Sequence, residues 1–254
     1  MASSQAVYNE GAYICSVHGI QYPPPRNLDE LKLREWELKC PQCRKNMLPI
    51  LTNEEKPTQG ESISALSKLF EELLSLSLGK QLNIPVVALR YAVTYGPRQS
   101  LYNPYTGVVS IFSTRILNNL GPVIYEDGLQ TRDFIYVSDI ARANLFVMEN
   151  EKTNFQSFNV GTGKATTALE LVKVLCKAYR INVAPVLHSE FRPQDVRHFV
   201  HDSSKLQSLG FKPLVSLEEG ITLTTEWIKK QENIPESFSN AEQVLKKQGI
   251  VLKA

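Results

Sequence analysis

Apolar positions along the chain follow two spacings that alternate with one another. Short continuous apolar runs, such as PVVALRY at 85–91 and SFNV at 157–160, favour buried parallel strands. From residue 62 to residue 81, apolar side chains recur every three or four residues, as on one face of a helix. They are Ile63, Leu66, Leu69, Phe70, Leu73 and Leu74. Strands that alternate with helices predict an α/β protein with parallel elements.

The C-terminal half continues this alternation. The spacing predicts a helix over about 108–118, and FIYVSDIARANLFVME (134–149) predicts a strand that turns into a helix capped by Ser138. Another helix is expected within TTALELVKVLCKAY (166–179). In SLEEGITLTTEWIKK, Ser216 and Glu219 stand at the spacing of a capping box and predict one more helix.

Residues 10–57 interrupt the pattern, because they are rich in proline and charge and predict irregular structure. They contain two pairs of metal-ligating residues, Cys15-x-x-His18 and Cys40-x-x-Cys43, about twenty residues apart. This spacing is typical of a zinc ribbon, in which four ligands close a tetrahedron and leave no open position for catalysis. The sequence therefore predicts a structural zinc site. The alternative is a chance spacing of buried or free cysteines and a surface histidine.

Charge and composition exclude several classes of function. The chain has 28 basic and 26 acidic residues, a net charge of +2 that gives no strong field for nucleic acid or anionic membranes. The basic residues of 10–57 are interleaved with acidic ones, which disfavours a nucleic-acid-binding zinc ribbon. No apolar run is long enough to span a bilayer, and MASSQAVYNEG lacks the pattern of a signal peptide. Three clustered cysteines and a remote Cys176 form no secreted disulfide framework, so we expect a cytoplasmic protein.

One glycine-rich segment, GTGKAT at 161–166, follows a strand as a dinucleotide-binding loop does. Thr166 stands where the third glycine belongs, and INVAPV, about twenty residues on, offers no acidic residue for a ribose hydroxyl. We therefore expect a turn rather than a cofactor loop.

Six blocks occur in order along the chain: SSQAVYNEG, SISALSK, LRYAVTYGPRQ, EDGLQTRDFIYVSDIARA, FNVGTG and RPQDVRHFVHDSSKLQSLGFKP. From residue 2 to about residue 230 the chain resembles the extended short-chain dehydrogenase/reductase family, and within it the NAD-dependent nucleotide-sugar epimerases and dehydratases. The Cys/His pairs fall between the first two blocks. Such an insert is similar to that of a subgroup of the dTDP-rhamnose 4-epimerase kind.

The resemblance implies a domain plan. Residues 1–9 and 58–100 would be the remnant of a doubly wound, Rossmann-type NAD-binding domain, and 10–57 a zinc-ribbon-like insert. Residues 101–230 would mainly form a small α/β domain for the nucleotide sugar, and 231–254 a C-terminal helical tail. In the family, the first strand and the glycine-rich loop for NAD precede the SSQAVY block. The chain is thus expected to be the C-terminal part of a longer parent, with an uncovered apolar face, and the complete protein a homodimer.

The resemblance also implies the site. The family removes a hydride from the sugar to NAD while a tyrosine, a lysine and a Ser or Thr hydroxyl handle the proton. Ser4 matches the hydroxyl and Lys68 the lysine, which also contacts the cofactor, but Ser64 stands at the position of the tyrosine. Arg132 and Arg192 match the phosphate-binding arginines. The loop that covers the nucleotide in the family contains here Gln99, Asn103 and Tyr105.

Three interpretations follow. The first is NAD-dependent epimerisation of a nucleotide-diphosphate sugar, with this chain truncated and catalytically impaired. The second is a non-catalytic protein that binds a nucleotide sugar or depends on a partner for activity. The third, remote interpretation is a zinc-ribbon module that binds nucleic acid.

Overall fold

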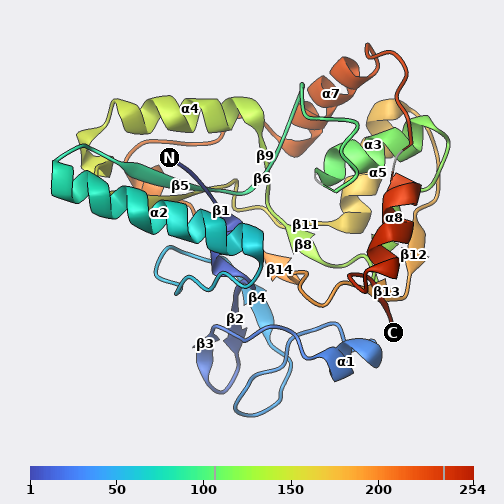
Figure 1. Cartoon of the computed structure of the whole chain (residues 1–254), viewed down its shortest axis with the longest axis horizontal. Helices are drawn as coiled ribbons and strands as arrows, with labels where there is room; N and C mark the ends of the chain where they lie inside the picture. Colours follow the sequence, from blue (N-terminus) through green and yellow to red (C-terminus); the bar gives the residue numbers. More distant parts are fainter. Residues whose placement is uncertain (106, 237) are drawn as a thin grey trace.

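The computed structural model describes residues 1–105, 107–236 and 238–254. Its central element is a parallel sheet in the order β1 (Ala2–Ser4), β5 (Val87–Tyr91) and β10 (Gln156–Val160). Leu89 of β5 lies opposite Ala2 on one side and Phe158 on the other. The apolar runs at 85–91 and 157–160 therefore form parallel strands, as the sequence predicts (Figure 1).

Two long helices cover opposite faces of this sheet. They are α2 (Ile63–Leu82) and α4 (Val137–Met148). Because side chains alternate along a strand, Leu89 packs against α4 in one apolar core, whereas Arg90 points to α2 and pairs with its Glu72. Ser62 caps α2 by accepting a hydrogen bond from the amide of Ala65 (3.1 Å).

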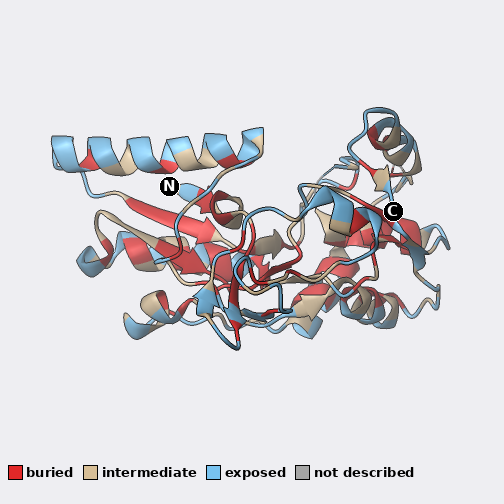
Figure 2. Cartoon of the chain, turned by 90° about the horizontal axis from the view of Figure 1, so that it is seen from below, coloured by how far each residue is buried: buried red, intermediate tan, exposed pale blue. Residues whose placement is uncertain are grey.

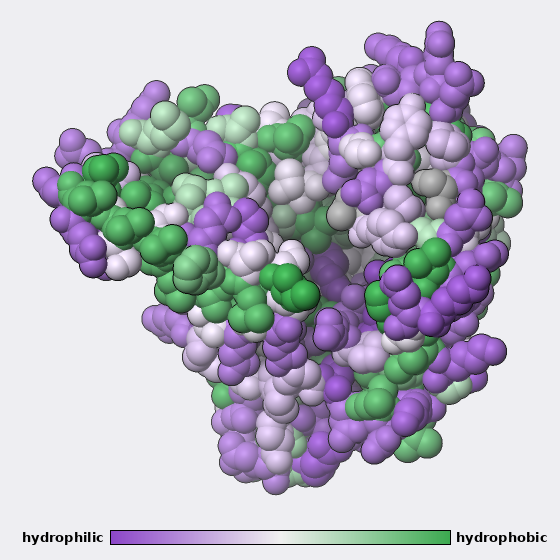
Figure 3. All heavy atoms as spheres, in the orientation of Figure 1, coloured by the Kyte–Doolittle hydropathy of each residue, from purple (hydrophilic) through white to green (hydrophobic). Residues whose placement is uncertain are grey.

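The outer face of α2 is apolar and exposed. Phe70 is 67% and Leu73 58% exposed, and Ile63, Leu66, Leu74, Leu78 and Leu82 are exposed as well. Figure 2 shows most of this helix as exposed, and Figure 3 shows hydrophobic side chains gathered along it. The predicted helix is confirmed, but much of the apolar spacing that predicted it faces outward rather than into the core.

A second core lies between the other helices and short strands. Its elements are β6 (Val93–Tyr95), α3 (Val108–Leu117), β7 (Val123–Tyr125), β9 (Phe134–Tyr136), α5 (Ala168–Tyr179), β12 (Val186–His188) and α7 (Leu217–Ile228). Phe112, Ile116, Leu175 and Ile221 are buried together in it. Thr167 and Glu170 form a capping box at the start of α5. Ser216 caps α7 by accepting from the amide of Glu219.

The predicted cap of α4 is wrong. The strand β9 runs directly into the helix, so Tyr136 occupies the cap position and Ser138 already lies in the first turn. Asp139, in the same turn, accepts hydrogen bonds from the amides of Leu214 and Val215 (both 3.0 Å). This carboxylate ties the helix to the chain that leads into α7.

The insert of residues 10–57 is more regular than its composition predicts. It contains β2 (Ala12–Cys15), β3 (Gly19–Gln21), α1 (Leu28–Lys32) and β4 (Leu48–Ile50). The three strands form an antiparallel sheet in the order β3-β2-β4. Exposed side chains on these short strands, such as Ile14 and Ile20, concealed the pattern of a half-buried sheet.

The remaining elements join these parts. They are the 3-10 helices η1 (Gln5–Tyr8) and η2 (Glu151–Thr153), the helices α6 (Ser204–Ser208) and α8 (Phe238–Lys247), and the short strands β8 (Thr131–Arg132), β11 (Thr166–Thr167), β13 (Glu190–Phe191), β14 (His198–Phe199) and β15 (Leu252–Lys253). β8 lies between β11 and β14, and β15 pairs with β13. Among the described residues, no helix has both the length and the apolar character that crossing a membrane requires.

Candidate functional site

A pocket of about 320 Å³ opens between α3, β7, β8 and the loop after β13. Three residues singled out in the sequence line it: Tyr105, Arg132 and Arg192. Tyr125, at the end of β7, and Phe238, at the start of α8, add aromatic surface. The pocket thus combines two cationic side chains with aromatic walls.

The two arginines are held differently. The Arg132 guanidinium donates to the carbonyl oxygens of Thr131 (2.9 Å), Val196 (2.5 Å) and Arg197 (3.2 Å). These neutral partners fix the side chain but leave its charge uncompensated. The Arg192 guanidinium lies over the Tyr125 ring, 5.0 Å from its centre, and its Nε has no hydrogen-bond partner among the described residues. Both groups are able to bind an anion in the pocket.

Gln99 and Asn103 do not line this pocket. The side-chain oxygen of Gln99 accepts from the Ser110 hydroxyl at the start of α3 (3.2 Å). Asn103 is exposed, and its side chain accepts from the amide of Tyr105 (3.0 Å). In this structure both residues shape the loop that places Tyr105.

The three residues matched to proton transfer lie near one another in the fold, on β1 and the first turns of α2. Ser4 caps η1, its hydroxyl accepting from the amide of Ala6 (3.1 Å). Lys68 donates to the carbonyl of Ala2 (3.1 Å) and to Glu71 (2.8 Å). Ser64 is exposed. No hydrogen bond connects these three side chains in the part of the chain that the structure describes.

The GTGKAT segment is a turn, as predicted. The amides of Thr162 (2.9 Å) and Gly163 (3.0 Å) donate to the buried carboxylate of Asp133. A Cβ at Gly161 would lie 2.4 Å from Asp133 Oδ2, so a side chain there would collide with it. Because these amides already bind a carboxylate, they are not free for a pyrophosphate. The segment 161–163 therefore does not fit the phosphate-binding turn of a dinucleotide cofactor.

The two Cys/His pairs meet in the insert. The nearest ligand atoms of Cys15, His18, Cys40 and Cys43 all lie within 4.8 Å of one another. Cys15 Sγ is 3.6 Å from Cys43 Sγ and 3.8 Å from His18 Nδ1, and Cys40 Sγ is 3.4 Å from that same nitrogen. Ligands about 2.3 Å from one tetrahedral zinc would be about 3.8 Å apart, so the arrangement fits this ion.

The electrostatics of this Cys/His cluster favour a thiolate. Hydrogen bonds from the amides of Val17 and His18 lower the pKa of the Cys15 thiol to about 6. Hydrogen bonds from the His18 ring to the sulfurs of Cys40 and Cys15 raise the pKa of His18. A bound metal requires deprotonated cysteines, and the backbone around Cys15 supports that state.

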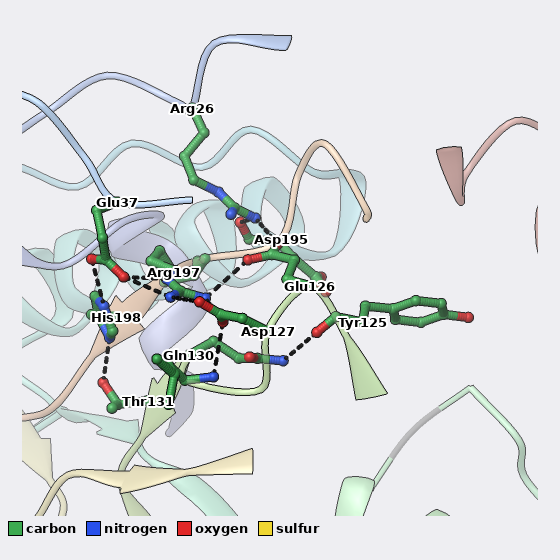
Figure 4. Close-up of polar contacts among 12 residues, drawn as sticks. Arg26, Glu37, Tyr125, Glu126, Asp127, Gln130, Thr131, Asp195, Arg197 and His198 are labelled. Carbon is green, nitrogen blue, oxygen red and sulfur yellow. Dashed lines mark hydrogen bonds and ion pairs between the residues drawn. The ribbon is translucent and has the colours of Figure 1, made fainter. Parts of the chain in front are cut away.

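A cluster of charged residues that the sequence interpretation missed lies beside the pocket (Figure 4). Its centre is Arg197, whose side chain is completely buried. Arg197 binds Glu37 (2.6 Å), Asp127 (2.7 Å) and Glu126 (3.1 Å), and Arg26 binds Glu126 from the other side (2.8 Å). We call these five residues the Arg197 cluster. Its only sequence signal was the position of Arg197 five residues after Arg192 in the same motif.

The pKa values of two acids in the Arg197 cluster, Glu37 and Asp127, are lowered, which keeps both ionised. Burial raises the pKa of Glu37, but hydrogen bonds from His198 and Arg197 outweigh it and lower the value to about 2. Burial also acts against Asp127, whose pKa is nevertheless lowered by Arg197. Outside the cluster, Glu10 accepts the amides of Arg197 (2.8 Å) and His198 (3.0 Å). The insert therefore holds both the side chains of residues 197–198, through Glu37, and their backbone amides, through Glu10.

The fold and the pocket together define an α/β protein of Rossmann-like type with a pocket lined by two arginines. Residues 47–161 match the NAD dependent epimerase/dehydratase family, and the chain is a homologue of its members. It is 34% identical to the dTDP-L-rhamnose 4-epimerase of Burkholderia thailandensis over 91% of this chain and 62% of that protein. It is 30% identical to the dTDP-D-glucose 4,6-dehydratase of Bos taurus over 76% of this chain and 54% of that protein.

Solved structures agree. The UDP-glucose 4-epimerase of Thermotoga maritima with UDP-glucose has a TM-score of 0.67 and 37% identity over 71% of this chain and 58% of that one. The UDP-N-acetylglucosamine 4-epimerase of Methanobrevibacter ruminantium, in complex with UDP-N-acetylmuramic acid, has a TM-score of 0.71 and 30% identity over 91% and 62%. The chain thus spans about three fifths of the length of these epimerases. The predicted fold class and family are confirmed.

Proposed function

We propose that the pocket binds the diphosphate and base of a nucleotide-diphosphate sugar. The observation that carries this proposal is the convergence of Arg132 and Arg192, from separate segments, on one pocket with aromatic walls. A guanidinium binds phosphate oxygens through paired donors, and Tyr125 and Phe238 offer flat surfaces for a base. Solved relatives that hold UDP-glucose and UDP-N-acetylmuramic acid support this class of ligand.

We further propose that the chain forms the substrate side of NAD-dependent epimerisation and is impaired in proton transfer. In the family, NAD accepts and returns the hydride. In this chain Ser64 offers an alkyl hydroxyl, a far weaker acid than a phenol, at the tyrosine position. The exposed Ser64 and the engaged side chains of Ser4 and Lys68 support this assignment. The alternative is a non-catalytic nucleotide-sugar-binding protein, which the same pocket would serve.

We also propose that the Cys/His cluster holds one structural zinc. Its four ligands complete a tetrahedron, so the site leaves no position for a substrate. The insert's cations support a structural role over nucleic-acid binding, because Lys39 and Arg44 pair with Glu30 on its surface. The cytoplasmic location stays a prediction.

Calorimetry with UDP and dTDP tests the proposed pocket. We expect saturable binding of at least one of them, weakened about tenfold or more by Arg192→Ala, since a hydrogen bond to a charged group contributes about 1.5–3 kcal/mol. Lys177→Ala is the matched control, because Lys177 is exposed on α5 and does not line the pocket. Absence of binding to both nucleotides, or an equal loss in the control, would contradict the proposal.

A further inference from the structure

The insert reaches the wall of the pocket through charged side chains. Arg26 donates to the carbonyl of Asp195 (2.7 Å) and pairs with Glu126, and both of these residues line the pocket. Arg26 and Glu126 are each 4% exposed at the side chain, so the pair is shielded from water. Glu37 binds Arg197 and His198, as Figure 4 shows. Arg26 and Glu37, both in the insert, thus hold the segment 195–198 in place.

The segment 195–198 positions Arg132, one of the two cationic side chains that line the pocket. The carbonyls of Val196 and Arg197 accept the Arg132 guanidinium, and the Arg197 carbonyl also accepts the amide of Thr131 (3.1 Å). The Thr131 hydroxyl is hydrogen-bonded to His198 (2.9 Å), whose other ring nitrogen faces Glu37 (3.1 Å). Any shift of residues 196–198 would therefore move the groups that aim Arg132.

Within the insert, Glu37 lies close in sequence to Cys40 of the Cys/His cluster. The next residue, Leu38, is buried with Tyr13, Cys15, Cys40 and Met47 in one small core. The Leu38 carbonyl accepts a hydrogen bond from the amide of Met47 (3.1 Å), and the amide of Cys40 donates to the carbonyl of Lys45 (2.8 Å). A core of five residues is too small to order a segment by itself, and a metal that closes the four ligands would supply the missing free energy.

We propose that Glu37 and Arg197 are positioning residues that couple metal binding in the insert to nucleotide binding in the pocket. Metal binding orders residues 38–43, which holds the neighbouring Glu37 in place. Glu37 and Arg197 in turn hold the backbone carbonyls that accept hydrogen bonds from Arg132. The inference rests on the proposed zinc and the proposed pocket. Because coupling between binding sites is reciprocal, nucleotide must also tighten the retention of the metal.

Hydrogen exchange of the full chain, with and without bound zinc, tests the mechanical step without any nucleotide. Removal of zinc is expected to speed amide exchange both in the insert and in segments 126–132 and 195–199. Exchange in β5 should not change, because this strand contains no group of the coupling path and pairs with β1 and β10 rather than with the insert. An increase confined to the insert, or none at all, overturns the coupling.

A substitution at Glu37 distinguishes the effect of this side chain from the effect of losing the metal. Glu37→Gln is expected to speed exchange in segments 126–132 and 195–199 while zinc stays bound, and Glu37→Asp to restore part of the protection. Glu35→Gln is the matched control, since Glu35 pairs with Lys39 within the insert. An equal effect of both glutamine variants would contradict the special role of Glu37.

Titration with UDP then measures the coupling itself. Zinc removal is expected to weaken UDP binding to the wild-type chain by about fivefold or more, the usual lower range of coupling between sites. In Glu37→Gln binding should already be weaker, and zinc removal should add little to the loss. If zinc removal weakens UDP binding by the same factor in the wild type and in Glu37→Gln, the two losses are independent and the coupling is overturned. If the zinc-loaded wild type binds dTDP but not UDP, the same titrations are made with dTDP. If it binds neither nucleotide, the proposed pocket is wrong, whereas the exchange experiments still decide the positioning role.

Discussion

Arg90 of β5 and Glu72 of α2 form a buried two-pronged ion pair between the sheet and its helix. Arg90 Nη2 lies 2.6 Å and Nε 3.1 Å from Glu72 Oε1. The hydroxyls of Ser3 (2.5 Å) and Ser157 (2.8 Å) donate to the same carboxylate. This network joins all three strands of the parallel sheet to α2.

Removal of Glu72 is expected to be strongly destabilising. Glu72→Ala would leave the Arg90 charge buried without its partner, which costs about 3–5 kcal/mol of unfolding free energy. Urea denaturation followed by circular dichroism measures the difference. Glu71→Ala is the control, because Glu71 is 47% exposed at the side chain and should change stability by about 0.5 kcal/mol or less. Comparable losses in the two variants would argue against the network.

The apolar outer face of α2 predicts self-association. Contiguous exposed apolar surface of this kind is usually covered by another polypeptide, and we expect a second copy of this chain to cover it here. Sedimentation velocity is expected to show concentration-dependent association that the double substitution Phe70→Ser and Leu73→Ser reduces. Both side chains are more than half exposed, so folding should be preserved. A monodisperse monomer of the wild type would contradict the prediction.

The ion pair of Glu37 predicts a specific pH dependence. Its pKa in the folded chain is about 2, below its ordinary value of 4.5, so its contribution to stability is fully present above about pH 4.5 and lost as the pH falls through about 2. The melting temperatures of the wild type and Glu37→Gln should differ by a constant amount near neutral pH and converge in acid. Asp127, whose pKa is lowered by the same Arg197 and raised by the Glu37 charge, also titrates in acid in both proteins. A gap that is unchanged down to pH 2 would contradict the assignment.

The Cys/His cluster predicts about one zinc per chain when the protein is prepared without chelator. Cys43→Ser is expected to lower this content strongly, whereas Cys176→Ser, outside the insert and within α5, should not. Elemental analysis measures the content. Acid should release the metal, because protons compete for the thiolates. Retention of a full equivalent by Cys43→Ser would exclude the predicted ligand set.

The turn at Gly161–Gly163 predicts that this chain alone does not bind NAD measurably. Its amides are satisfied by Asp133, and calorimetry with NAD should show no saturable heat. Binding with a stoichiometry of one would mean that other residues form the cofactor site. Ser64→Tyr would then be the variant in which to look for epimerisation.

The elements that the sequence predicted well are those with local signals. Ser62 caps α2, and its apolar spacing marks the length of the helix; Thr167 and Ser216 likewise set the starts of α5 and α7. Arg132 and Arg192 could be found because each belongs to a short motif. Asp133 and Asp139 both bind backbone amides, Asp133 at the GTGKAT turn and Asp139 from the first turn of α4.

The parts that were missed depend on residues far apart in the chain. Arg197 and Glu37 are 160 positions apart, and neither local spacing nor composition indicates that they meet. The sheet of the insert was missed because its strands are three or four residues long and partly exposed. A buried arginine among charged neighbours is the residue that a pattern-based interpretation assigns to the surface.

Phe238 lines the pocket from α8, and β15 pairs with β13 just before Arg192. Phe238, in the segment 231–254 that was expected to be a C-terminal helical tail, therefore forms part of one wall of the pocket. Phe238 follows every other pocket-lining residue in the order of synthesis. Until Phe238 has left the ribosome, a chain whose sheet and insert have already folded lacks part of one wall of its pocket, so nucleotide cannot assist the earlier steps of its folding through that wall.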